Sequence, residues 1–422
     1  MPWGFGGAAS SPCRWTGAAP PTPNATIRTT RSTPPSSLPT PFGNPRILGL
    51  VHLFDDRTHS VRDLAVTPRM TIYVCGITPY DAAHLGHAFT YTHFDVLVRL
   101  LRHAGAEVLH AQNITDVDDD ILRVAKERGE DYLELGNREV AGFVEQMRTI
   151  GNEPPTFSPR ATEFVPQMIE EVRNLLTVGH AYERSGTVYF RIASDPDYGS
   201  LSGLTREQML PLAEERGGHP EDANKDDPLD FVLWQRSVEG EPWWESPWGR
   251  GRPGWHIECS TMSQSLLGQP LDIHGGGTDL IYPHHESETA QAECGHPTDT
   301  PFVRRWMHTG TVYMAGEKMS KSLGNLTFVR DLLARHGPMA IREFLLRHHY
   351  REDWEFDEAA LDLVADPGEG PASREAFLGA LEDDLNTPEA LRVLDRAAAL
   401  GDVALRDECR DLLGLSEVRS AP

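Results

Sequence analysis

The apolar residues of this chain fall into alternating strand-like and helix-like runs. The apolar run at 73–77 predicts a buried strand, and the apolar positions between Ala88 and Leu101 recur with helical spacing. We therefore expect a helix from about 87 to 104, followed by a second strand at 107–112. A strand, a helix and a strand at this spacing form a right-handed parallel unit, which is how a nucleotide-binding sheet begins.

The next hundred residues predict an insertion into that sheet. Residues 121–180 show helical periodicity, and a short strand at 187–191 and a short helix at about 205–215 follow. Glycines and a proline directly after this helix are typical of a helix end. We interpret 121–230 as an insertion between the two halves of the sheet.

The second half of the sheet is expected to resume with a strand at 229–234. A later strand that starts at Leu271 runs into three consecutive glycines, 275–277. Glycines at the carboxyl end of a strand indicate a close approach of the backbone to a ligand.

The two ends of the chain differ from its centre. Residues 1–46 are rich in Pro, Ser, Thr and Ala and contain no acidic residue, so we expect a disordered tail, although an organellar transit peptide fits loosely. A strand or hairpin is predicted over 47–69. We assign 47–330 to the catalytic domain and 331–422 to a small helical region, whose first helix is interrupted at Gly337-Pro338.

Length and composition limit the classes of function. A chain of 422 residues is long enough for two or three domains. Its net charge of −24 weighs mildly against a general nucleic-acid binder, since a local basic patch can hide in an acidic average. No apolar run approaches the roughly 20 residues of a membrane span. The cysteines are few and scattered, which favours a reducing cytoplasm over a disulfide framework: Cys13, Cys75, Cys259, Cys294 and Cys409.

Two segments carry candidate phosphate chemistry. His84 and His87 lie three residues apart at the expected start of the first helix, where backbone N–H groups can face a phosphate and Gly86 allows close approach. Lys318 and Lys321 lie in a glycine-flanked loop, where they can neutralise departing pyrophosphate. The alternatives are two incidental histidines and a solvated surface loop.

The end of the second strand supplies further site candidates. Asn113 and Thr115 stand at the carboxyl end of that strand, where the ligands of such sheets bind. The acidic run at 118–120 is better explained as the cap of the next helix, because Asp accepts hydrogen bonds from the first turn and favours the helix dipole.

A metal site is the third candidate. His284 and Glu288 are four residues apart on a predicted helix that opens at Pro283, so they share a face. With Cys75 and Cys259 they form a donor set suited to tetrahedral Zn²⁺. The sequence spacing alone specifies little, and a capped helix with a buried histidine is the alternative.

Taken together, these segments resemble one family. From about Val51 to Leu400 the chain resembles cysteinyl-tRNA synthetase, of the class I aminoacyl-tRNA synthetases, and its relative, the cysteine ligase of mycothiol biosynthesis. The resemblance is carried by Cys-Gly-Ile-Thr at 75–78, His-Leu-Gly-His at 84–87, Asn-Ile-Thr-Asp-Val-Asp-Asp at 113–119, Gly-Trp-His-Ile-Glu-Cys at 254–259, Gly-Gly-Gly-Thr-Asp at 275–279, Pro-His-His-Glu at 283–286 and Lys-Met-Ser-Lys-Ser at 318–322.

The resemblance implies an α/β fold with a class I Rossmann-type parallel sheet, an inserted connective region and a small C-terminal helical appendage. It implies that ATP, with Mg²⁺, activates L-cysteine as an adenylate, helped by His84, His87, Lys318 and Lys321. It implies one Zn²⁺ held through Cys75, Cys259 and His284, with Glu288 at the position of a fourth ligand. The residues implied to contact the adenylate are Cys75, Gly76, Ile77, Thr78, Gly86, Thr90, Asn113, Ile114, Thr115, Trp255, Gly277, Thr278, Asp279 and Val312.

The two relatives differ in the acceptor of the cysteinyl group. Residues 215–220 and 78–82 resemble the ligase, and the short stretch after Ser322 lacks most of what a synthetase uses to read an anticodon. Glu288 and the segment 228–234 resemble the synthetase instead.

We favour the ligase, with the amine of glucosaminyl-inositol as acceptor. A truncated cysteinyl-tRNA synthetase that charges tRNA is the alternative, and an inactive paralogue is a third reading. No membrane partner is expected. A monomer is the working expectation, although the sequence does not determine the assembly.

Overall fold

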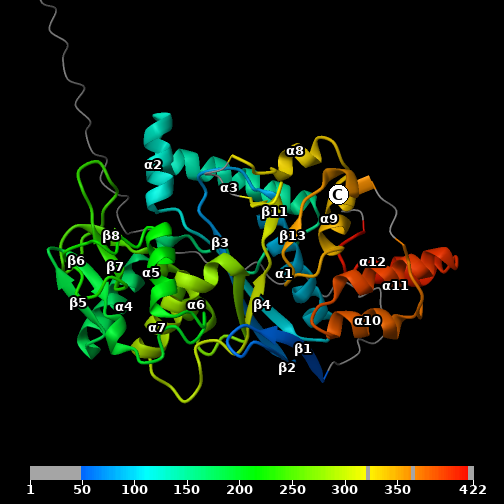
Figure 1. Cartoon of the computed structure of the whole chain (residues 1–422), viewed down its shortest axis with the longest axis horizontal. Coiled ribbons are helices and arrows are strands. Elements are labelled where there is room, and N and C mark those ends of the chain that lie inside the picture. Colours follow the sequence, from blue (N-terminus) through cyan, green and yellow to red (C-terminus); the bar gives the residue numbers. More distant parts are fainter. Residues whose placement is uncertain (1–48, 320–323, 363–365, 417–422) are drawn as a thin grey trace, which may run out of the picture. The chain divides into compact units, whose positions relative to one another are not determined.

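The computed structural model describes residues 49–319, 324–362 and 366–416, all of which lie in one compact unit. The tail predicted over 1–46 and the candidate residue Lys321 lie outside the described residues. Figure 1 shows the order of the helices and strands along the chain.

A four-stranded parallel sheet lies at the centre of this unit, with strand order β10-β9-β3-β4. Its strands are β3 (Arg69–Ile77), β4 (Glu107–Ile114), β9 (Ile273–Gly277) and β10 (Trp306–Thr309). Tyr73 of β3 stands beside Ala111 of β4 and His274 of β9. The predicted parallel sheet is confirmed, because strands from both halves of the chain pair at its centre.

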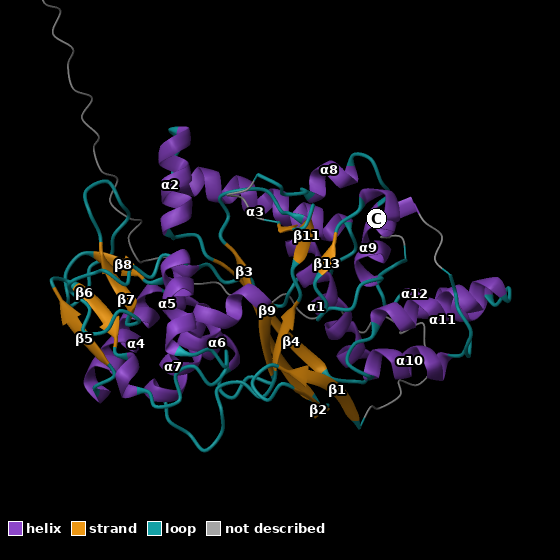
Figure 2. Cartoon of the chain, viewed as in Figure 1, coloured by secondary structure: helices purple, strands orange, loops and turns teal. Residues whose placement is uncertain are grey.

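Helix α1 (Leu85–His103) follows β3 and is buried along most of its length. It packs against β4 and against α9 (Pro338–Leu346), so the C-terminal region helps to cover it (Figure 2). The helix predicted over about 87–104 is therefore confirmed.

The inserted region carries its own antiparallel sheet, of order β5-β6-β7-β8. The strand predicted at 229–234 to resume the parallel sheet is β7 (Phe231–Arg236), which pairs with β6 and β8 instead, so that expectation is wrong. An apolar run shows that a strand is buried but not which sheet it joins. The other elements from α2 to β8 are α2 (Asp119–Arg128), α3 (Tyr132–Thr149), η1 (Ala161–Glu163), α4 (Val165–Val178), β5 (Ala181–Arg184), β6 (Thr187–Phe190), η2 (Ile192–Ser194), α5 (Arg206–Glu215) and β8 (Gly251–Pro253).

Three of the four metal candidates lie on the segments before and after β9, and the fourth, Cys75, lies on β3. Helix α6 (Trp255–Leu267) precedes β9, and η3 (Thr278–Leu280) follows it. The helix expected to open at Pro283 begins only at Glu286, as α7 (Glu286–Gly295). The preceding turn, η4 (Ile281–His285), is π-helical with an extended residue at Tyr282, so His284 and His285 are placed by this turn.

The remaining elements frame the sheet. The predicted N-terminal hairpin is β1 (Leu50–Asp55) with β2 (Ser60–Ala65), and the predicted break at Gly337-Pro338 separates α8 (Val329–Leu333) from α9. The other elements are β11 (Val312–Met314), β12 (Glu317–Lys318), β13 (Trp354–Glu355), η5 (Glu358–Asp362), α10 (Arg374–Glu382), α11 (Thr387–Ala399) and α12 (Val403–Arg410). No helix within 49–319, 324–362 or 366–416 has the length and apolar character needed to cross a membrane.

Candidate active site

A cavity of about 300 Å³ is lined by residues at the carboxyl ends of β3, β4 and β9, with contributions from β10, β11 and β12. The chemistry predicted from separate segments meets here: every predicted site residue that the structure describes lines the cavity, except Ile114 and Glu288. Glu288 is fully buried.

The turn between β3 and α1 forms one end of the cavity. His84 is the N-cap of α1, and its Nδ1 accepts a hydrogen bond from the His87 N–H group at 3.4 Å. The two imidazole rings stack with their centroids 3.7 Å apart. A Cβ atom on Gly86 would lie 3.1 Å from the His84 ring, so glycine is favoured where the turn passes under that ring. Both histidines therefore present their rings beside a helix N-terminus, as the phosphate hypothesis requires.

The contact between β3 and β4 fixes the floor of the cavity. A Cβ on Gly76 would lie 1.5 Å from the backbone oxygen of Asn113, so only glycine fits. The Gly76 N–H group donates to Asn113 Oδ1 at 2.7 Å, and Asn113 Nδ2 donates to Thr115 Oγ1 at 3.2 Å. Asn113 and Thr115 are thus held in fixed orientations. The predicted cap of the following helix is confirmed, since the Asp118 side chain accepts from the Asp120 N–H group.

Basic side chains converge on Asp279 at the rim. Lys318 Nζ lies 3.3 Å from Asp279 Oδ2, and Arg216 Nη1 lies 3.7 Å from the same oxygen. Burial alone would raise the pKa of Asp279, but Lys318 and Arg216 hold it below its usual value. Lys318 is thereby held at the cavity, and Arg216 brings the end of α5 to the same place.

Four potential metal ligands meet beside the cavity, and three of them, Cys75, Cys259 and His284, line it. The ligand atoms of Cys75, Cys259, His284 and Glu288 all lie within 4.8 Å of one another. Glu288 Oε1 is 3.0 Å from His284 Nε2 and 3.6 Å from Cys75 Sγ. All four side chains are buried. The separation of four residues predicted for His284 and Glu288 does place them together.

The electrostatics of this group suit a divalent cation. Burial and the neighbouring Cys259 and Glu288 raise the pKa of Cys75 well above its usual value, and burial likewise raises the pKa of Glu288. Burial lowers the pKa of His284, so its ring is neutral. His284 Nε2 faces the carboxylate without a hydrogen bond of normal geometry. Two sulfurs, a neutral imidazole and a carboxylate fit a tetrahedral metal ion.

The aromatic residues around His284 hold its ring in place. Trp255 stacks on it with centroids 4.3 Å apart, and His256 Nδ1 lies 3.0 Å from His284 Nδ1. Partners of this kind orient the nitrogen that binds a metal.

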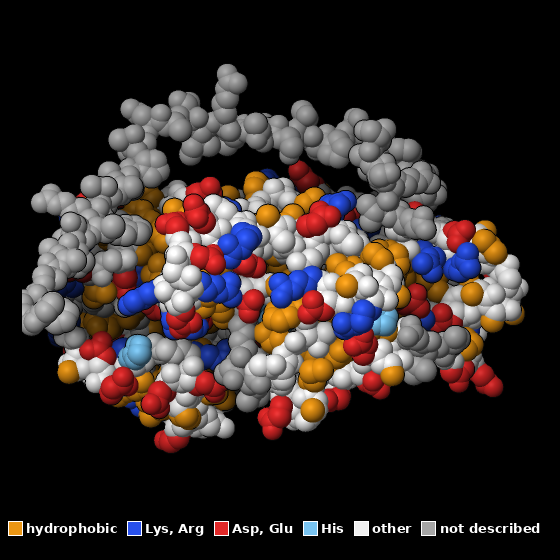
Figure 3. All heavy atoms as spheres, turned by 90° about the horizontal axis from the view of Figure 1, so that it is seen from above, with side chains coloured by type: hydrophobic (Ala, Val, Ile, Leu, Met, Phe, Trp, Pro, Cys, Tyr) orange, Lys and Arg blue, Asp and Glu red, His pale blue; other side chains and the backbone are white. Residues whose placement is uncertain are grey.

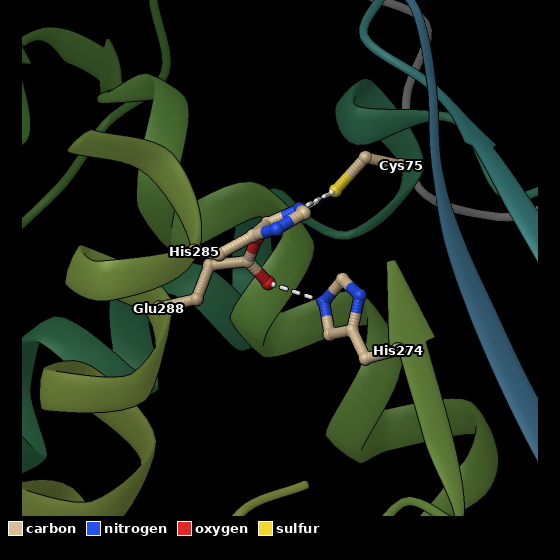
Figure 4. A group of neighbouring side chains, drawn as sticks. All are labelled: Cys75, His274, His285 and Glu288. Atoms are coloured by element: carbon tan, nitrogen blue, oxygen red, sulfur yellow. Dashed lines mark hydrogen bonds and ion pairs between the residues drawn. The ribbon is translucent and has the colours of Figure 1, made fainter. Parts of the chain in front are cut away.

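The sequence predictions missed several residues of this region. His274 and His285 are buried beside Glu288 and Cys75, as Figure 4 shows, and His308 is buried next to His285. Histidines inside otherwise apolar strands are the signal that could have found His274 and His308. Other residues that line the cavity and were not predicted include Tyr80, Tyr91, Asp120, Leu280 and Thr309.

The parallel sheet and the cavity at its carboxyl edge can be compared with those of known protein families. Residues 63–366 match the family model of the tRNA synthetases class I (C) catalytic domain, so the chain belongs to this family. The Mycobacterium tuberculosis methionyl-tRNA synthetase in complex with methionyl-adenylate has a similar fold, with a TM-score of 0.60 at 17% identity over 83% of this chain and 89% of that chain. The predicted class I Rossmann-type fold is confirmed.

Two of the proteins that are similar to this chain in sequence are ligases. The L-cysteine:1D-myo-inositol 2-amino-2-deoxy-alpha-D-glucopyranoside ligase of Thermomonospora curvata is 46% identical over 374 residues, 85% of this chain and 90% of the relative. The cysteine--tRNA ligase of Shewanella sp. strain MR-4 is 44% identical over 383 residues, 83% of this chain and 82% of the relative. The prediction that this protein is a ligase is confirmed.

Proposed function

We propose that this protein uses ATP to activate L-cysteine as cysteinyl-adenylate and transfers the cysteinyl group to an amine. One observation carries the first half of the proposal. Three members of a buried set of metal-ligating side chains, Cys75, Cys259 and His284, line the same cavity as His84, His87 and Lys318. A site for a thiol and a site for phosphates are thus joined in one pocket.

The metal end supplies selectivity for a thiol. The residues that would hold Zn²⁺ are Cys75, Cys259 and His284, with Glu288 as a fourth ligand that the substrate thiol would displace. When bound, Zn²⁺ acts as a Lewis acid that lowers the pKa of a substrate thiol, which favours cysteine over serine. Cys75, Cys259 and His284 line the cavity, so a substrate side chain can approach this side of the site.

The other end stabilises charge on the phosphates. The cysteine carboxylate attacks the α-phosphate of ATP, and pyrophosphate leaves with the charge that develops on it. The N-terminus of α1, His84, His87 and Lys318 lie where they can stabilise that charge, and we assign Lys321 the same role. Mg²⁺ accompanies ATP in this proposal.

The fixed polar groups of the floor orient the amino acid. Asn113 is held by Gly76 and in turn holds Thr115, and Trp255 is packed against His284. Groups held in this way can place a carboxylate near its target without losing conformational entropy on binding. We assign the remaining adenylate contacts to the predicted residues that line the cavity.

The acceptor we propose is the amine of glucosaminyl-inositol. The amine nitrogen attacks the carbonyl carbon of the adenylate, AMP leaves, and an amide forms. The Thermomonospora curvata relative, whose name contains this type of acceptor, supports the choice. Residues 215–220, which resemble that ligase, place Arg216 beside Asp279 at the cavity rim. The segment that distinguishes the relatives therefore contacts the site.

A tRNA 3′-terminal hydroxyl is the alternative acceptor, and the Shewanella relative supports it. On the face shown in Figure 3, basic side chains lie among acidic and apolar ones and do not form one continuous patch. Acidic groups on that face would repel a polyanion.

The test measures AMP release from ATP and cysteine with either glucosaminyl-inositol or cysteine tRNA added. Acceleration by the amino sugar, with a cysteinyl amide as product, is the expected result. Charging of the tRNA without amide formation would overturn the acceptor and leave the activation step in place. A lack of cysteine-dependent pyrophosphate exchange would overturn both steps.

A further inference from the structure

The carboxylate of Asp279 is shared by two cations that come from distant parts of the chain. Lys318 ends β12, whereas Arg216 is the C-cap of α5 in the inserted region. Lys318 Nζ lies 3.3 Å from Asp279 Oδ2, and Arg216 Nη1 lies 3.7 Å from the same oxygen. The described residues that line the cavity include Asp279 and Lys318 but not Arg216. Lys318 therefore belongs to the wall of the cavity, and Arg216 supports that wall from the inserted region.

Arg216 makes a second contact with the same residue. Its Nη1 donates a hydrogen bond to the backbone oxygen of Asp279 at 3.4 Å, in addition to the ion pair with the side chain. Asp279 Oδ1 lies close over Gly277, because a Cβ atom on that glycine would be 2.6 Å from it. A guanidinium presents its N–H groups in a rigid planar fork, which suits contacts with two neighbouring oxygens. Arg216 can therefore keep Asp279 paired without the help of Lys318.

The position of Arg216 is fixed by the end of α5. This helix packs against η4, the turn that follows η3 and Asp279. The Gly218 N–H group donates to the backbone oxygen of Ala213 at 2.7 Å, and a Cβ atom on Gly218 would lie 2.6 Å from that oxygen. The chain can therefore close the helix in this way only with glycine. Glu215 Oε1 also lies 3.7 Å from Arg216 Nε, but the Glu215 side chain is mostly exposed, so solvent screens this pair.

The ion pair of Lys318 with Asp279 opposes the role proposed for Lys318. An ammonium group that turns toward the phosphates gives up its carboxylate, and a carboxylate left without a cation away from bulk water is costly. Arg216 reduces this cost, because Asp279 keeps one cation after Lys318 has turned away. Without Arg216, Asp279 would retain Lys318, and the phosphates would have to compete for it.

We propose that Arg216 is a positioning residue that takes over Asp279 when Lys318 turns to the phosphates of ATP. It acts through Asp279 and not on the phosphates themselves. The inserted region thereby controls how readily positive charge reaches the pyrophosphate that leaves. The inference rests on the proposed function, because it needs the phosphate role of Lys318.

A double-mutant cycle on cysteine-dependent pyrophosphate exchange tests this role. Arg216→Ala is expected to lower kcat/KM for ATP by about 10-fold with little change in KM for cysteine, because Asp279 then retains Lys318. Arg216→Lys supplies another cation for Asp279 and should recover most of the loss. In the Asp279→Asn background, Arg216→Ala should change kcat/KM for ATP by less than about twofold, because Asn carries no charge that retains Lys318.

Arg206→Ala is the matched control. Arg206 lies at the other end of α5 and pairs with Asp227 at 2.7 Å, so its loss should leave the exchange rate unchanged. If Asp279→Asn has no measurable exchange, the Lys318→Ala background replaces it, and Arg216→Ala should cost no more than about threefold there.

Three outcomes would overturn the role of Arg216. They are an Arg216→Ala variant as active as the wild type, a loss that Arg216→Lys does not recover, and a full 10-fold loss that persists in the Asp279→Asn or Lys318→Ala background. The last would mean that Arg216 supports the fold or contacts ATP directly. A wild-type protein without cysteine-dependent exchange would overturn the proposed function, and the inference with it.

Discussion

The two ends of the cavity are built in different ways. At the phosphate end, His84 and His87 come from one turn of one helix, and their geometry is set by that local turn. At the metal end, Cys75, Cys259, His284 and Glu288 come from a strand, a helix, a π-helical turn and another helix. The phosphate end is partly open to water, whereas the metal end is buried.

This difference predicts how strongly mutations in each group of residues reduce activity. A charge near water can be replaced in part by solvent or a neighbouring cation, so its loss costs a limited factor. In a buried cluster, the charge of each ligand is stabilised by the other ligands and not by water. The loss of one ligand therefore weakens metal binding by the whole cluster. Mutations at the metal end should therefore cost more and should affect the choice of amino acid.

The largest expected effect is that of Cys259→Ala. We expect kcat/KM for cysteine in pyrophosphate exchange to fall by at least about 10³-fold, because the variant loses a ligand of the Zn²⁺ that would bind the substrate thiol. Selectivity for cysteine over serine should fall with it. Cys294→Ala is the control, and full activity with intact selectivity in Cys259→Ala would contradict the metal assignment.

Lys318→Ala should have a smaller effect of a different kind. We expect kcat to fall by about 10²-fold with little change in KM for cysteine, because one of several cations facing pyrophosphate is lost. Lys126→Ala removes the same charge from the exposed side of α2 and should leave the rate unchanged. A raised KM for cysteine with unchanged kcat would place Lys318 at the amino acid rather than at the phosphates.

Acidification should weaken metal binding at the buried end. The pKa values of Cys75 and Glu288 are raised in the metal-free protein, so protons compete with the ion up to a higher pH than usual. Zinc affinity should therefore rise with pH and fall by about tenfold or more for each unit of acidification. Competition with a chromophoric chelator at pH 6, 7 and 8 measures this, and an affinity that does not change with pH would exclude thiol ligands.

The smallest expected effect is at the N-terminus of α2, in Asp118→Asn. Burial and the neighbouring Asp119 and Asp120 raise the pKa of Asp118 to about 6. The pKa of this carboxyl is therefore higher in the folded protein than in the unfolded chain, where it is about 4. Its contribution to the free energy of unfolding is fully present below pH 4 and is lost as the pH rises through about 6. Asn keeps the cap without the charge, so the variant should gain about 1 kcal/mol at pH 8 after solvent screening.

Unfolding by urea at pH 5 and pH 8 measures this difference. The gain should shrink at pH 5, where Asp118 is mostly protonated. A variant that is less stable by the same amount at both pH values would mean that the carboxylate does more than cap α2.

The sequence by itself determined the elements whose signals are local. The start of α1 (predicted at about 87 and found at Leu85), the cap of α2 at Asp118 and the break before α9 follow from periodicity, capping residues and Gly-Pro, which act within a few residues. Many of the residues that line the cavity could likewise be named from motifs that end a strand or start a helix, although Tyr91 and Thr309 were missed.

Only the tertiary structure decided which segments become neighbours. The strand at 231–236 joins the inserted antiparallel sheet, although its apolar run suits either sheet. His274 meets Glu288 because β9 pairs with β3 and α7 follows it, and His285, in the kinked segment 281–285, meets Cys75 of β3. Pairing between strands and the path of a turn depend on contacts between residues far apart in the sequence, which local patterns do not specify.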